Sequence, residues 1–280
     1  MGRRNFFDRL VRTIDYQKEY QKIDSLVLRP SSLRSQSLED DIECYFKIWK
    51  YNANYLSFKE LRDQLEFTFE CDDYYNVPTG YIKDVNDFFD YCEMIINMIE
   101  LLPDEKVIYH GKNVNEIIRL INFDLNSLNH EIRKVDDRYL IIQKDAAVSE
   151  VVDIVEDSLA KIILEYNHYV LKGDLERKKN ILVKIGNALE PKKSEIKGIN
   201  NQLYKDYFYL INNMDIRHNN CDSSDKSNYN EYFDKLTPKE KEEWYDEIYQ
   251  MGLLIFLLLE NRERSTKVAN IKNLQSNAKK

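Results

Sequence analysis

An arginine and a histidine stand side by side in this chain, at Arg217 and His218, and together they could act on phosphate. An arginine offers a rigid fork of donors for phosphate oxygens, and a histidine exchanges protons near neutral pH. When RNA is cleaved by its own 2′-hydroxyl, His218 could move the proton and Arg217 could stabilise the charge that grows on phosphorus. That chemistry requires no metal ion. The pair therefore predicts a candidate metal-independent ribonuclease site.

The region between Ile199 and His218 is expected to be the helix that positions this pair. Its apolar residues follow one stripe at helical spacing, Leu203, Tyr207, Leu210 and Met214, and Arg217 is the next position. An arginine that continues an apolar stripe needs a partner for its charge. The expected supporting residues are Asn212, Asn213 and Asp215. The alternative interpretation is a purely structural, hydrogen-bonded helix end, where the helix dipole favours a histidine.

A basic stretch precedes this helix and could follow the backbone of a nucleic acid. Residues 171–200 contain eight lysines and arginines against four acids, within a chain of net charge −8. Positive surface attracts RNA by releasing counterions from its phosphates. The residues expected to contact RNA are Arg177, Lys178, Lys179 and Lys184. The alternative is an ordinary solvated helix face.

The composition predicts an all-α fold. Glycine (7) and proline (5) are rare among the 280 residues, at about a third of their average usage. This scarcity argues against a sandwich, a barrel or a glycine-rich phosphate-binding fold. Residues 137–144 break the helical period, and they predict a short β-hairpin or, in the alternative, an extended segment. The longest apolar run, residues 251–259, is too short to span a bilayer, and no secretory-type leader is evident, so we expect a soluble, cytoplasmic protein.

Charge divides the chain into two regions. Residues 41–110 contain 6 basic and 15 acidic side chains, whereas residues 111–280 are almost neutral. With breaker residues between 102 and 111, this predicts an acidic helical region, 1–110, of unknown role and a helical domain, 111–280. The acids of the expected 84–101 helix form a solvated surface, or in the alternative a metal site: Asp84, Asp87, Asp90 and Glu93. The four cysteines lack zinc-ligand spacing, so we expect no metal and no cofactor.

Apolar periodicity predicts the remaining helices. The expected ranges are 1–26, 38–70, 84–101, 113–134, 149–171 and 175–189, with a linker over 30–37 and a loop over 72–80. The last helix has the clearest start, because Thr237, Pro238 and Glu240 match a capping box with proline at the first helical position. Residues 251–259 are apolar on nearly all sides, which indicates a central helix of a bundle or half of a dimer interface.

The string from Leu210 to Asn220 resembles the asparagine-rich, Arg-His-containing helix end of HEPN-type domains in bacterial abortive-infection proteins. The resemblance extends to 139–150, 181–191, 204–210 and 245–259, and so covers about residues 111–262. It implies a helical bundle that forms a homodimer and cleaves RNA without a metal, in antiviral defence. Residues 1–110 lie outside the resemblance, and in the ribonuclease hypothesis this acidic region serves as a regulator, a sensor or a module that binds a regulatory protein.

This chain departs from the pattern of that family. The family's active motif usually separates arginine and histidine by several residues, whereas Arg217 and His218 are adjacent. Adjacent residues on one helix point about 100° apart. The pair could meet phosphate across a dimer axis. The alternative is a non-catalytic helical interaction or sensor protein related to HEPN domains.

Overall fold

The structure is a computed structural model that describes residues 14–30, 36–67 and 81–277. Within these ranges it is helical apart from one two-stranded antiparallel hairpin, which confirms the predicted all-α fold with a short hairpin. The chain divides into two compact units, residues 1–141 and 142–280. None of the helices in the described ranges combines the length and apolar character that a membrane crossing needs.

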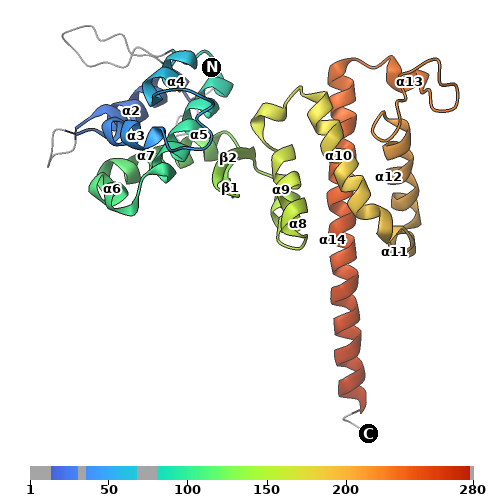
Figure 1. Ribbon diagram of the computed structural model, residues 1–280. Coiled ribbons are helices and arrows are strands. Elements are labelled where there is room, and N and C mark those ends of the chain that lie inside the picture. Colours follow the sequence, from blue (N-terminus) through green and yellow to red (C-terminus); the bar gives the residue numbers. More distant parts are fainter. Residues whose placement is uncertain (1–13, 31–35, 68–80, 278–280) are drawn as a thin grey trace, which may run out of the picture. The chain divides into compact units, whose positions relative to one another are not determined.

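Unit 1 is a small helical core with the hairpin at its end (Figure 1). Its elements are α2 (Tyr16–Leu28), α3 (Leu38–Phe46), α4 (Phe58–Gln64), α5 (Val85–Leu101), α6 (Asp104–Tyr109), α7 (Gly111–Ser127), β1 (His130–Val135) and β2 (Arg138–Gln143). α2 packs on α7, α5 and α3. Because α7 belongs to this core, the unit boundary falls after Ile141 and not between residues 102 and 111, where the charge pattern placed it.

Several helix limits in unit 1 differ from the sequence prediction. The predicted helix 113–134 is wrong in its last part, because α7 ends at Ser127, Asn129 takes a left-handed φ of 59°, and β1 follows. The predicted helix 38–70 is interrupted between α3 and α4. The predicted helix 84–101 is confirmed by α5, whose N-terminal N–H groups bond to the Asp84 carboxylate. Residues 1–13, 31–35 and 72–80 of the other predictions lie outside the described residues.

Unit 2 is a bundle built around one long helix. Its elements are α8 (Ala146–Val152), α9 (Asp157–Tyr166), α10 (Leu175–Leu189), α11 (Lys193–Ile199), α12 (Asn201–Asn213), α13 (Glu231–Asp234), α14 (Pro238–Asn277) and two 3₁₀ turns, Tyr169–Leu171 and Glu190–Lys192. α14 packs against α8, α10, α11 and α12 (Figure 1). The predicted 149–171 helix is wrong as one element, because it divides into α8, α9 and a 3₁₀ turn.

α14 begins as the sequence predicts and takes the central place in the bundle. The Thr237 hydroxyl and N–H both donate to the Glu240 carboxylate, and the Glu240 N–H donates to the Thr237 hydroxyl, which completes the capping box. Leu253 and Ile255 are fully buried. The apolar run 251–259 therefore supplies the core of unit 2, as its nearly continuous apolar surface indicated.

Candidate functional site

α12 ends before it reaches Arg217, which corrects the sequence prediction. Its last residue is Asn213, and Asp215 then takes a left-handed φ of 56°. Aspartate tolerates this conformation because its short polar side chain can bond to nearby backbone. Arg217 and His218 therefore lie in a loop, and neither continues the apolar stripe of the helix. The 100° separation expected for neighbours on a helix does not apply to them.

The loop is held by a reciprocal pair of hydrogen bonds between Asp215 and Asn220. The Asp215 N–H donates to Asn220 Oδ1 at 2.8 Å, and the Asn220 N–H donates to Asp215 Oδ1 at 2.9 Å. Asn220 is buried, and its Nδ2 donates to the Asn228 carbonyl. Asn230 Nδ2 donates to the carbonyl of Asn213 at 2.7 Å. Because these four hydrogen bonds join both ends of the segment to neighbouring backbone, they hold the loop that carries Arg217 and His218.

Arg217 is anchored to the end of α10. Its N–H donates to the Ile211 carbonyl at 3.1 Å, and its Nη2 lies 2.5 Å from Glu190 Oε2. The same nitrogen lies 3.5 Å from Asn187 Oδ1. Hydrogen bonding to Lys193 and then to Arg217 lowers the pKa of Glu190. Glu190 therefore balances the charge of the guanidinium, while 18% of the Arg217 side chain stays accessible.

His218 is exposed, in contrast to Arg217. Its imidazole forms no hydrogen bond or ion pair with another residue of the described ranges. A neutral imidazole in this position can accept one proton and donate another. The loop thus presents a proton-transfer group to solvent, one residue away from a partly accessible guanidinium.

The three predicted supporting residues differ in how much they contribute to the loop. Asp215 shapes the loop, and Asn213 contributes its carbonyl to Asn230 while its own Nδ2 donates to Tyr209. The side chain of Asn212 is half-buried and has no hydrogen-bond partner among the described residues. Asn212 therefore has no visible role in holding the site.

The predicted RNA-binding role of Lys178 conflicts with its position. Its side chain is 7% exposed, and its Nζ lies 2.7 Å from both Glu242 and Asp246. It also lies over the ring of Tyr166. Helical periodicity points this lysine into the bundle, where two α14 carboxylates neutralise it. It is a core ion pair and offers no charge to a phosphate.

The other three predicted RNA-binding residues lie in different settings. Lys179 binds Asp215 at 2.9 Å and so supports the loop that carries His218. Arg177 is exposed and pairs with Glu165 at 3.1 Å. Lys184 is exposed and lines a cleft that α10 shares with α9 and α14. The four residues therefore do not form one basic surface.

Four site residues escaped the sequence analysis as partners of the loop, namely Asn187, Glu190, Asn220 and Asn230. Asn220 and Asn230 stand in an asparagine-rich and aspartate-rich segment, which is typical of side chains that bond to backbone. That composition could have indicated a built loop. Glu190 and Asn187 gave no signal, because only folding brings α10 against the end of α12.

The described residues contain no group of three or more histidine, cysteine or acidic side chains placed to hold a metal ion. Two of the acids weighed for a metal site have structural partners in unit 1. Asp84 caps α5, and Glu93 accepts the Ile141 N–H at 2.7 Å.

No protein-family model matches the chain, and neither a curated protein nor a solved structure matches it.

Proposed function

We propose that this protein is a metal-independent endoribonuclease of the abortive-infection type. It acts in the cytoplasm as a homodimer, and its N-terminal region binds a regulatory protein. The observation that carries the proposal is the exposed His218 imidazole, held beside Arg217 on a loop fixed by Asp215 and Asn220. A rigid loop that displays an unpaired proton-transfer group beside a cation is suited to attack by a ribose 2′-hydroxyl.

In this proposal His218 transfers the proton and Arg217 stabilises the phosphorane-like transition state. The 2′-hydroxyl attacks phosphorus, the bond to the 5′-oxygen breaks, and a 2′,3′-cyclic phosphate and a 5′-hydroxyl result. His218 removes the proton from the attacking hydroxyl or returns one to the leaving oxygen. Arg217 has to exchange Glu190 for a phosphate oxygen, since one carboxylate already faces its Nη2. Glu190 thereby limits access to Arg217 in the unbound protein.

The test compares RNA cleavage by the full chain with that of Arg217→Ala and His218→Ala, all in EDTA. We expect each variant to lose about 100-fold or more in rate, the usual contribution of acid–base or charge stabilisation. The matched control is Lys226→Ala, an exposed residue of the same loop segment, which should cleave like the parent. Equal cleavage by parent and both variants, or no cleavage by the parent, would overturn the proposal.

The Arg217–Glu190 ion pair favours a second candidate, a non-catalytic helical interaction or sensor protein. In this case the pair only ties the loop to α10. Glu190→Gln separates the two candidates, because it removes the charge that holds Arg217. A ribonuclease should then bind and cut RNA faster. A non-catalytic protein should leave RNA intact and show only a looser loop.

A further inference from the structure

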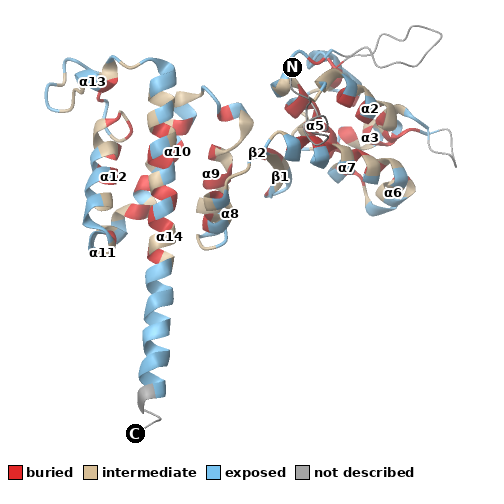
Figure 2. Cartoon of the chain, turned by 180° about the vertical axis from the view of Figure 1, so that it is seen from behind, coloured by how far each residue is buried: buried red, intermediate tan, exposed pale blue. Residues whose placement is uncertain are grey.

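The C-terminal part of α14 is a helix with no packing face of its own within the unit. All residues from Asn261 to Gln275 are exposed, and Figure 2 shows this part of α14 in pale blue, in contrast to the red and tan part that the bundle surrounds. Most helical stability in proteins comes from packing of one face, and a solitary helix of this length is marginal in water. Exposed apolar residues on this part include Val268, Ile271 and Leu274. A partner that covers Ile271 and Leu274 would stabilise this part of the helix.

One face of α14 carries acids and bases that would face opposite charges if a second copy of the helix ran antiparallel to it. Its residues recur at spacings of three and four, so they share a stripe: Phe256, Glu260, Glu263, Lys267, Ile271 and Leu274. Along this stripe an apolar residue is followed by two acids, then by a base and two apolar residues. Arg264 lies at its edge, beside the midpoint.

We propose that α14 pairs antiparallel with α14 of a second copy of this chain, centred between Glu263 and Arg264. In that register Glu260 faces Lys267 of the second copy, and Glu263 faces Arg264. Phe256 faces Ile271. Each contact occurs twice because the pair is symmetric. A parallel pair would instead set each charge against its own copy, so the sequence favours the antiparallel arrangement.

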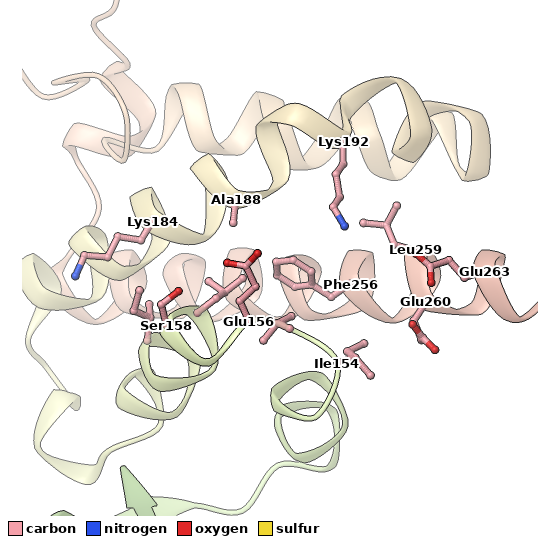
Figure 3. Close-up of a pocket in the computed structure, with 13 residues that line it drawn as sticks. Ile154, Glu156, Ser158, Lys184, Ala188, Lys192, Phe256, Leu259, Glu260 and Glu263 are labelled. Carbon is pink, nitrogen blue, oxygen red and sulfur yellow. The ribbon is translucent and has the colours of Figure 1, made fainter. Parts of the chain in front are cut away.

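The bundle has a cleft that side chains of this second helix would enter. It has a volume of about 520 Å³ and lies between α9, α10 and α14. Its lining includes Phe256, Leu259, Glu260 and Glu263 of α14 (Figure 3), so the stripe faces it. A cavity of about 150 Å³ already accepts a benzene-sized group. The cleft therefore has room for Ile271 of the second copy, and its lining also includes the apolar residues Leu159 and Ile162.

The charges of the stripe are largely available for such pairing. Glu263 and Lys267 form no ion pair with another residue of the described ranges, although they are one helical turn apart. Glu260 binds Arg264 of its own helix at 3.1 Å. Two carboxylates, Glu260 and Glu263, thus stand at the mouth of the cleft where Lys267 and Arg264 of the second copy would arrive.

This interface specifies the dimer of the proposed function and rests on that part of it alone. Cleavage by a monomeric protein would overturn the interface and leave the chemistry intact. A dimer that leaves RNA intact would overturn the cleavage chemistry and leave the interface in place. The two proposals therefore fail separately.

The first test measures the mass of the full chain by analytical ultracentrifugation. The parent should be dimeric, and Lys267→Glu together with Arg264→Glu should raise its dissociation constant about 100-fold or more, because like charges then face each other at four contacts. Lys272→Glu is the matched control, since it reverses the same charge on the opposite face of the helix and should leave the dimer unchanged. A monomeric parent, or equal effects of the two charge reversals, would overturn the interface.

The second test fixes the direction of the pair. A Glu260→Cys protein mixed with a Lys267→Cys protein should form a disulfide-linked dimer, whereas neither protein alone should do so beyond the background of the parent's own cysteines. Mixing Glu260→Cys with Lys272→Cys should give no added product. Efficient linkage of Glu260→Cys alone would indicate a parallel pair and contradict the proposal. Circular dichroism verifies that all variants stay folded.

Discussion

The buried ion pairs of unit 1 differ from the candidate loop of unit 2 in how far solvent reaches their charges. In unit 1 Arg62 is 1% exposed, and its Nη2 lies 2.9 Å from Asp24, which also accepts the Tyr91 hydroxyl at 2.8 Å. Burial raises the pKa of Asp24, and the Arg62 charge opposes this. In unit 2 the pair of Arg217 and Glu190 lies at the surface, and His218 has an open face. The buried charges of unit 1 therefore stabilise the fold, whereas the unit 2 loop carries charges that a ligand can reach.

A second cluster of charged side chains in unit 1 is also buried and paired. Asp41 is buried and accepts from Lys106 at 2.7 Å and lies 2.8 Å from His110 Nε2. The pKa of Asp41 is lowered because these two hydrogen bonds outweigh the raising effect of burial. His110 is itself buried, so it is closed to any large substrate. The His110 imidazole in unit 1 thus pairs with the Asp41 carboxylate, whereas His218 faces solvent.

The largest effect should follow from breaking the buried pair of unit 1. Arg62→Met leaves the Asp24 carboxylate inside the core without its counter-charge, and we expect a loss of about 3–5 kcal/mol in unfolding free energy. Urea denaturation measures it. The control is Arg177→Met, which breaks an exposed pair with Glu165 and should cost less than about 1 kcal/mol. If both variants lost the same unfolding free energy, the buried pair of unit 1 would contribute no more to stability than an exposed pair of unit 2, which contradicts the prediction.

An intermediate effect should follow from Asn220→Ala. The substitution removes the side-chain partner of the Asp215 N–H and of the Asn228 carbonyl, so we expect a loss of about 1–3 kcal/mol. Amide hydrogen exchange should rise in the loop that carries Arg217 and His218. Asn219→Ala, at an exposed neighbouring position, should change neither quantity. Unchanged exchange in Asn220→Ala would show that the reciprocal pair does not hold the site.

The smallest effect concerns the titration of Glu190. Its pKa is lowered in the fold, so the contact with Arg217 is complete above the ordinary glutamate pKa and is lost as the pH falls through the lowered value. Lys193 is the larger cause and Arg217 the lesser. NMR titration should therefore show a larger upward pKa change in Lys193→Ala than in Arg217→Ala. The opposite order would mean that Arg217 is tied more firmly than we propose, and less free for phosphate.

Local signals explain which helices could be predicted. The limits of α10 and the start of α14 follow from apolar periodicity and from a capping box, which act within a few residues of the chain. The end of α12 could not be predicted in this way. The apolar spacing continues to Met214, but a left-handed Asp215 bonded to Asn220 ends the helix first. Likewise, helical periodicity could place Lys178 on the inner face of α10, but nothing in the basic stretch indicated that two acids of α14 pair with it.

Composition and periodicity were enough to predict the helical class, the short hairpin and the central helix at residues 251–259. These properties depend on composition and on periodicity within single elements. The contact between Arg217 and Glu190, the ion pairs of Lys178 and the exposure of His218 became visible only in the packed structure. Side chains far apart in the chain find one another only when helices pack, and packing is set by the fit of whole faces and not by the identity of any one residue.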